Sequence, residues 1–164
     1  MAWAMALSGA LLASVPLRAS DGAVLADRVL VEKAQRRLIL FHGNTVLKTY
    51  SIALGRHPVG PKRRKGDGRT PEGHYVVDGR NPDSRFHRSL HLSYPNAEDR
   101  TWAAAHGVDP GQDIAIHGVD DRWGWSGPSH WSVDWTQGCI AVSDPAIDEI
   151  WQLVPDGTPV DIVP

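Results

Sequence analysis

The sequence predicts a mostly β domain with one or two short helices. Its 164 residues, 41% of them apolar and 22% charged, suit one globular domain with its own core. Short apolar runs bounded by turn residues predict strands at 28–32, 37–41, 46–53, 74–77, 113–118 and 159–163. Only two stretches carry helix signals, so strands should dominate the fold.

Each element has a local reason. His42, Gly43 and Asn44 provide a tight connection between the second and third strands. The stretch "NAEDRTWAAAHG" predicts a helix that Asn96 caps and Gly107 ends. The stretch "SDPAIDEIWQLV" predicts a second helix, with Asp144 as its cap and proline in its first turn. Apolar residues at spacings of three and four give this second helix one buried face: Ile147, Ile150, Trp151 and Val154.

The N-terminus begins "MAWAMALSGALLASVPLRAS", which has no charged side chain over residues 2–17. This apolar stretch is shorter than the roughly 20 residues that span a bilayer. It predicts a signal peptide or short anchor over residues 1–22 and a folded domain over 23–164. We therefore expect an exported protein of the periplasm or cell envelope.

The charge balance excludes some partners. A net charge of −2 provides no strong field for nucleic acid or an anionic membrane, so neither is expected as a partner. The exception is "PKRRKGDGR" at 61–69, with five cations and one anion, which we interpret as a solvated loop.

One stretch, "DWTQGCIAVSD", contains the only cysteine, Cys139. A lone cysteine in an exported protein is either a buried core residue or a reactive thiol. Gly138 would let a substrate carbonyl approach the sulfur, and nearby backbone N–H groups could stabilise an oxyanion. As a nucleophile, Cys139 should have a pKa below the free-thiol value of about 8.5, which requires a neighbouring base or cation.

His117 is the best-placed base among eight histidines. It leaves an apolar strand and is followed by Gly118, so a rigid element would present it to a loop. A structural histidine is the alternative for a lone residue. The pairing with Cys139 favours the catalytic interpretation.

The stretch "IHG" at Ile116–Gly118 precedes "TQGCIAV" at Thr136–Val142, with 18 residues between His117 and Thr136. Together the two stretches resemble the L,D-transpeptidase (YkuD-type) catalytic domain family. Upstream, "RLILFHGNTVLKTYSIALG" and "KGDGRTPEGHY" are similar to that family's opening strands and its Thr-Pro-Glu-Gly stretch. The likeness covers about 27–163.

The resemblance implies a β-sandwich domain without metal or cofactor, acting on peptidoglycan stem peptides. Cys139 would attack a peptide carbonyl, and His117 would accept and later donate the proton. Gly118 would orient the imidazole through its carbonyl, and the N–H groups of Gly138 and Cys139 would hold the oxyanion. An amine would then resolve the thioester.

Two positions depart from the family pattern: Gln137 replaces a histidine, and Ala141 an arginine or asparagine. The stretch also resembles a divergent branch that releases an outer-membrane lipoprotein from peptidoglycan, so a hydrolytic amidase with that partner is the alternative. Thr136, Gln137, Trp125 and Trp135 are the expected substrate contacts, although the tryptophans of the 119–135 loop could instead pack it onto the sheet.

Two other classes remain. A histidine-rich middle, with His87 and His91 four residues apart, suggests a zinc peptidase, but the glutamate of His-Glu-x-x-His is missing. The aromatic loop and basic segment would also suit a non-catalytic module that binds cell-wall peptides. The sequence does not determine the oligomeric state.

Overall fold

The computed structural model describes residues 22–119 and 133–164. The expected leader over 1–22 therefore lies almost wholly outside the described residues. Within the described ranges the chain forms eight strands and two helices. They are β1 (Arg28–Glu32), β2 (Arg37–His42), β3 (Thr45–Ser51), β4 (Gly73–Ser84), β5 (His87–Leu92), α1 (Ala97–Ala105), β6 (Ala115–His117), β7 (Ile140–Ala141), α2 (Asp144–Leu153) and β8 (Pro159–Val163).

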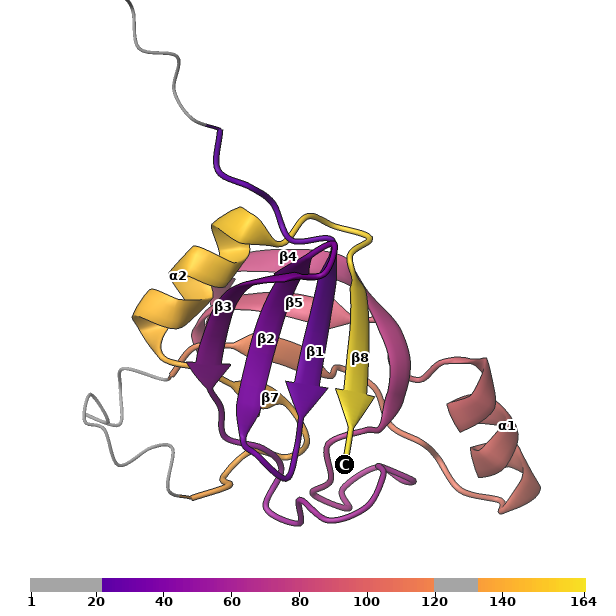
Figure 1. Cartoon of the computed structure of the whole chain (residues 1–164). Helices are drawn as coiled ribbons and strands as arrows, with labels where there is room; N and C mark the ends of the chain where they lie inside the picture. The colour runs from indigo at the N-terminus through magenta and orange to yellow at the C-terminus, as the bar shows by residue number, and fades with distance from the viewer. Residues whose placement is uncertain (1–21, 120–132) are drawn as a thin grey trace, which may run out of the picture.

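The strands form one sheet in the order β3-β2-β1-β8-β4-β5-β6-β7. β4 is long enough to pair with β8 near its start and with β5 further along, so the sheet folds over along it into two layers. Figure 1 shows β3, β2, β1 and β8 in front, with β4 and β5 crossing behind. Two backbone hydrogen bonds of 2.9 Å join Ala53 and Ala141, so residues after β3 close against β7. The predicted β-sandwich is confirmed.

The core lies between the two layers. Val29 and Val31 on β1 are fully buried, as alternation along a half-buried strand requires. On the other layer, Ile116 of β6 pairs with Ile140 of β7, and both are fully buried. The site described below is carried on the opposite face of β6 and β7.

α2 packs against β5 and β6 and buries Ile147 and Ile150, as its spacing predicted. Its cap differs from the prediction: Ser143 is the N-cap, and its side chain accepts from the Ala146 N–H. Asp144 is the first helical residue, and its carboxylate accepts instead from the Val119 N–H at 2.8 Å. Both residue types suit a helix start, so the sequence located it to within one residue.

α1 extends from the sheet on the side opposite α2 (Figure 1). Asn96 caps it as predicted, in a capping box with Asp99. The backbone of Gly107 has a φ of 63°, the left-handed conformation that ends many helices. The Tyr75 hydroxyl donates to Asp99 at 2.9 Å, which ties α1 to β4.

The prediction missed two strands and part of a third. β5 reads "HRSLHL", where polar residues conceal the strand pattern, and β7 has only two residues. β4 continues through Gly79 and Pro82, residues that normally interrupt a strand. These segments are strands because of their neighbours in the sheet, not because of local propensity.

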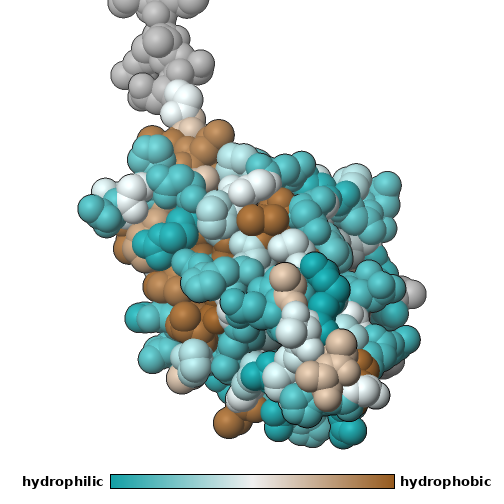
Figure 2. All heavy atoms as spheres, turned by 90° about the vertical axis from the view of Figure 1, so that its right-hand side faces the viewer, coloured by the Kyte–Doolittle hydropathy of each residue, from teal (hydrophilic) through white to brown (hydrophobic). Residues whose placement is uncertain are grey.

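The face that carries α1 is mostly hydrophilic, with smaller hydrophobic areas between (Figure 2). No helix in the described ranges has both the length and the apolar character needed to cross a membrane.

Candidate active site

Cys139 and His117 lie on the same face of neighbouring parallel strands. His117 pairs with Ala141 and Ile116 with Ile140, so Cys139 lies beside Ala115, two residues before the partner of His117. Neighbouring strands are about 4.8 Å apart, and two residues along a strand span about 6.6 Å. An imidazole can bridge that diagonal, and both side chains line one cavity.

His117 is almost completely buried, with 3% of its surface exposed. Its Nδ1 donates to the Gly118 carbonyl at 2.6 Å, which leaves Nε2 as the acceptor nitrogen. Phe86 stacks on the ring at a centroid distance of 4.4 Å, and Trp135 meets it edge-on at 5.8 Å. Burial lowers the pKa of His117 to about 4, despite the hydrogen bond to Gly118, so the ring is neutral near pH 7.

Gly118 is held too tightly for a side chain. A Cβ there would lie 2.4 Å from Asp144 Oδ1 and 2.9 Å from the Phe86 carbonyl oxygen. The start of α2 therefore fixes the backbone that orients His117. The contact between Gly118 and the imidazole is the one that the family resemblance implied.

Thr136 organises the turn before the cysteine. Its buried hydroxyl accepts from the Gly138 N–H at 3.0 Å and donates to the Cys139 carbonyl at 2.7 Å. Gly138 has a φ of 138°, and a Cβ there would lie 2.5 Å from the Arg69 carbonyl oxygen. Thr136 thus stabilises the turn through these two hydrogen bonds. In this conformation it occupies the Gly138 N–H, one of the two N–H groups expected to face an oxyanion.

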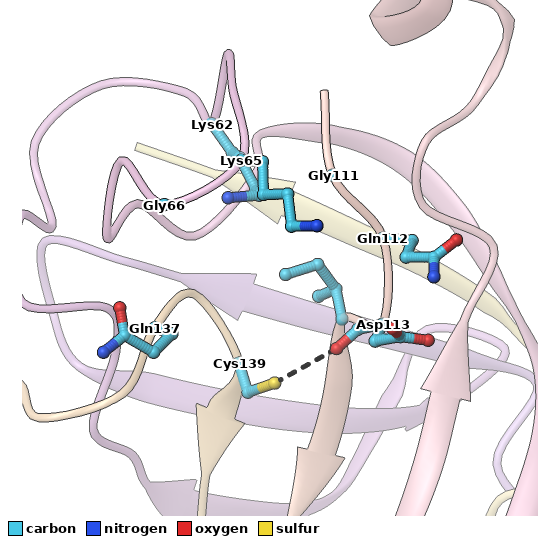
Figure 3. A pocket seen from close by; sticks show the side chains of 9 residues that line it. Lys62, Lys65, Gly66, Gly111, Gln112, Asp113, Gln137 and Cys139 are labelled. Atoms are coloured by element: carbon cyan, nitrogen blue, oxygen red, sulfur yellow. Dashed lines mark hydrogen bonds between the residues drawn. The ribbon is translucent and has the colours of Figure 1, made fainter. Parts of the chain in front are cut away.

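The Cys139 side chain is half-buried, and its sulfur lies 3.5 Å from the Asp113 carbonyl oxygen (Figure 3). Burial raises the pKa of the Cys139 thiol, while a backbone hydrogen bond from Ala115 and the charge of Lys62 partly offset that effect. The expectation of a lowered thiol pKa is therefore contradicted: desolvation of the thiolate outweighs the nearby cation.

Cys139 lies on the wall between two cavities. One, of about 190 Å³, also contacts Gln137, Lys62 and Lys65 (Figure 3). The other, of about 470 Å³, contacts His117 and Phe86. Cys139 therefore lines both cavities.

The other predicted substrate contacts lie at separate places around the site. Gln137 is exposed on the smaller cavity, and Trp135 lies beside His117. Ala141 is fully buried opposite His117, where a longer side chain would have no room without rearrangement. Trp125 lies outside the described residues.

Sequence reasoning missed Phe86 and Lys62. Phe86 lies in a polar stretch and carries no signal of its own. Lys62 belongs to the segment interpreted as a solvated loop, but only 4% of it is exposed, and it pairs with Asp67 at 2.9 Å. That interpretation is wrong for Lys62, because its ammonium group is folded inward.

The histidines considered for zinc have separate partners. His87 and His91 lie on β5, a strand, and pair with Asp148 and Asp78 at 2.9 Å and 2.5 Å. Among the described residues, no three His, Cys, Asp or Glu side chains are grouped closely enough to hold a metal ion.

The sequence matches the YkuD L,D-transpeptidase catalytic domain over residues 26–162, and the chain belongs to this family. It is 36% identical over 112 residues to "Putative L,D-transpeptidase YafK" of Escherichia coli (strain K12). That alignment covers 66% of this chain but only 37% of YafK, so the chain spans little more than a third of the curated relatives it matches.

Solved structures share the fold. The cell-shape-determining protein Pgp2 of Campylobacter jejuni superposes with a TM-score of 0.60 at 22% identity, covering 87% of this chain and 51% of Pgp2. An L,D-transpeptidase of Xylanimonas cellulosilytica superposes with a TM-score of 0.54 at 16% identity, covering 90% and 65%.

Proposed function

We propose that this chain is a cysteine-dependent acyl transferase of peptidoglycan stem peptides, in which a thioester on Cys139 is resolved by an amine. The observation that supports it is the placement of Cys139 and His117 on one strand face and in one cavity. Membership of the L,D-transpeptidase family supports the substrate class. The uncharged apolar N-terminus supports action in the periplasm or cell envelope.

The reaction starts from a neutral pair, because burial disfavours both the thiolate and the imidazolium. As Cys139 Sγ attacks the substrate carbonyl carbon, His117 Nε2 takes the thiol proton. The tetrahedral intermediate collapses by breaking the C–N bond, and the imidazolium protonates the departing amine. An incoming amine then attacks the thioester and loses a proton to His117. The C–S bond breaks, and His117 returns that proton to the sulfur, which restores the thiol.

Oxyanion stabilisation divides unequally between the two expected donors. The Gly138 N–H is held by Thr136, so the Cys139 N–H carries the larger share unless the turn shifts on binding. Thr136 acts as a positioning residue. Gln137, which lines the smaller cavity, and Trp135, which lies beside His117, contact the substrate.

The test incubates purified protein with tetrapeptide muropeptides plus an amine acceptor, and separately with lipoprotein-linked muropeptides, and resolves the products by mass. Transfer predicts cross-linked or amine-exchanged products, an acyl adduct on Cys139, and loss of both in Cys139→Ala. Freed lipoprotein peptide without exchange would instead establish the amidase. Full activity in Cys139→Ala would refute the assignment of Cys139 as the nucleophile. Binding of muropeptides without any product would favour the non-catalytic module that binds cell-wall peptides.

A further inference from the structure

A third cavity, of about 720 Å³, lies between the basic segment and α1. Three arginines, two histidines and a tryptophan share its wall with smaller residues. Its principal side chains are Arg63, Arg64, Arg69, His57, His106 and Trp102. Nothing in the proposed reaction uses these groups.

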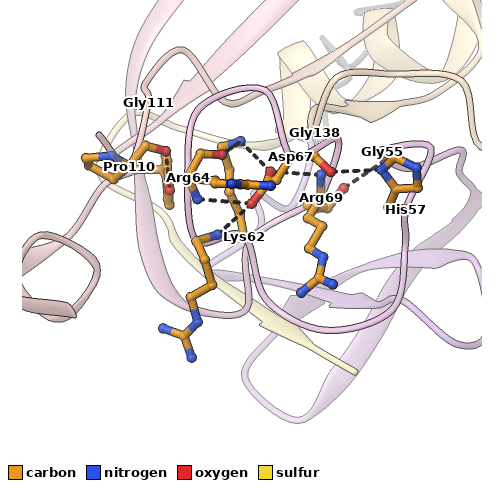
Figure 4. A network of polar contacts seen from close by, with 12 residues as sticks. Gly55, His57, Lys62, Arg64, Asp67, Arg69, Pro110, Gly111 and Gly138 are labelled. Atoms are coloured by element: carbon orange, nitrogen blue, oxygen red, sulfur yellow. Dashed lines mark hydrogen bonds and ion pairs between the residues drawn. The ribbon is translucent and has the colours of Figure 1, made fainter. Parts of the chain in front are cut away.

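The cavity is strongly positive because its one carboxylate is already engaged. Asp67 accepts from the backbone N–H groups of Arg63, Arg64 and Arg69, and from Lys62 Nζ at 2.9 Å (Figure 4). Burial alone would raise the pKa of Asp67, but these hydrogen bonds lower it. In the described part of the chain, no carboxylate pairs with any of the three guanidinium groups.

An aromatic surface lies beside this charge. The half-buried Trp102 stacks on His106 at a centroid distance of 3.7 Å, and the Arg63 guanidinium lies 4.7 Å above the Trp102 ring. Stacking orients Arg63, which reduces the conformational entropy that it loses on binding. Guanidinium groups suit planar carboxylates, and aromatic faces suit the apolar parts of a peptide or sugar ring.

This cavity is connected to the cysteine through short backbone links. Gly66 lines both this cavity and the smaller cavity at Cys139. Asp67 joins Lys62, on the cysteine side, to the arginine backbone. The arginine cavity therefore adjoins the smaller cavity at Cys139.

We propose that the cavity of Arg63, Arg64, Arg69 and Trp102 binds free carboxylates of peptidoglycan, and holds the polymer beside the cysteine while one of its peptides reacts. The choice of polymer rests on the proposed function. The preference for carboxylates rests on the charge and shape of the cavity.

The test is cosedimentation of Cys139→Ala protein with purified insoluble peptidoglycan at increasing salt. Arg63→Gln/Arg64→Gln should weaken binding about tenfold, which is about 1.4 kcal/mol for the loss of both exposed charges together. The matched control is Arg28→Gln/Arg100→Gln, which removes the same charge outside the cavity. Arg28 lies over the Phe41 ring, so the control also removes one arginine that stacks on an aromatic ring. Unchanged binding in the first pair, or equal loss in both, would overturn the proposal.

Two further measurements do not depend on a variant. Peptidoglycan whose carboxylates have been converted to amides should bind the protein about as weakly as unmodified peptidoglycan binds Arg63→Gln/Arg64→Gln. Binding of unmodified peptidoglycan to the protein without the arginine substitutions should weaken as salt rises. Equal binding to amidated polymer, salt-insensitive binding, or stronger binding to phosphatidylglycerol vesicles would each refute carboxylate recognition.

Failure of this inference and failure of the proposed function have different signatures. Transferase activity of the wild type on soluble muropeptides is measured separately from cosedimentation of the Cys139→Ala protein with the insoluble polymer. Activity without polymer binding would refute only the inference. Arginine-dependent polymer binding without transferase activity would refute only the proposed function.

Discussion

Burial determines the resting protonation of the two reactive residues. Burial lowers the pKa of His117 to about 4 and raises that of the Cys139 thiol, so both are neutral over a broad pH range. This differs from a resting thiolate–imidazolium pair, and it makes proton transfer to His117 part of the attack itself.

The pH profile of kcat/KM should reflect this neutral pair. We expect an acid limb near pH 4, where His117 becomes protonated. We expect an alkaline limb above the ordinary range of a free thiol, where ionisation of Cys139 removes the proton that His117 must pass to the departing amine. Initial rates of amine exchange across pH 3.5–10 would measure both limbs. An acid limb near 6.5 would mean that His117 is solvated or is not the base.

Alkylation of Cys139 by iodoacetamide should have a higher midpoint pH than alkylation of a free cysteine, because burial raises the pKa of the thiol. Lys62→Met should raise the midpoint further, because the lysine charge lowers the thiol pKa. Lys65→Met is the matched control, since Lys65 lines the same cavity without contributing to this pKa. Equal shifts in both variants would contradict a specific role for Lys62.

Protonation of His117 should also lower stability. Its pKa is about 6.5 in the unfolded chain and about 4 in the fold, so the unfolded state binds the extra proton first. This contribution is fully present above pH 6.5, and the free energy of unfolding falls by about 3 kcal/mol as pH drops to 4. Urea denaturation of the wild type and of His117→Gln would measure this at pH 6.5 and pH 4. Between these two pH values, the free energy of unfolding of the wild type should fall by about 3 kcal/mol more than that of the variant.

At the scale of the element, the cysteine depends on a turn, not on a helix. α2 begins at Asp144, five residues past the sulfur, so the turn from Thr136 to Cys139 sets the direction of the thiol. One hydroxyl makes two hydrogen bonds across this turn, and Gly138 permits its backbone conformation.

Thr136→Val should remove both hydrogen bonds while keeping the side-chain volume. We expect a loss of about 2 kcal/mol in the free energy of unfolding and most of kcat, since the turn carries the nucleophile. Thr136→Ser restores the hydroxyl and should recover most of both. If Thr136→Val kept kcat while losing stability, the turn would not position the sulfur.

At the scale of the molecule, the site forms only when distant parts of the chain meet. The cysteine segment is tied to the turn between β1 and β2 by Asp134, whose carboxylate accepts from Arg36 Nε and Nη2. The same carboxylate accepts from the Leu54 N–H at 2.9 Å. These contacts join the front layer to the segment that closes the sheet.

Asp134→Ala should destabilise the whole domain by about 2–3 kcal/mol, because it leaves the Arg36 charge and the Leu54 N–H without their partner. Glu32→Ala is the matched control: it breaks the pair with Arg37, which lies in solvent, and should change little. Chemical denaturation compares the two. Equal effects would argue against a closing role for Asp134.

The sequence by itself determined the paired β1–β3 segments, the buried face of α2, and the candidate pair Cys139 and His117, because turn residues, helical spacing and a strand exit are local signals. Tertiary structure alone decided β7, the ring of Phe86 against His117, the inward turn of Lys62 and the raised thiol pKa. The two residues of β7 pair as a strand, and the Cys139 thiolate is desolvated, only because distant parts of the chain pack around them. A local sequence pattern contains no information about those distant neighbours.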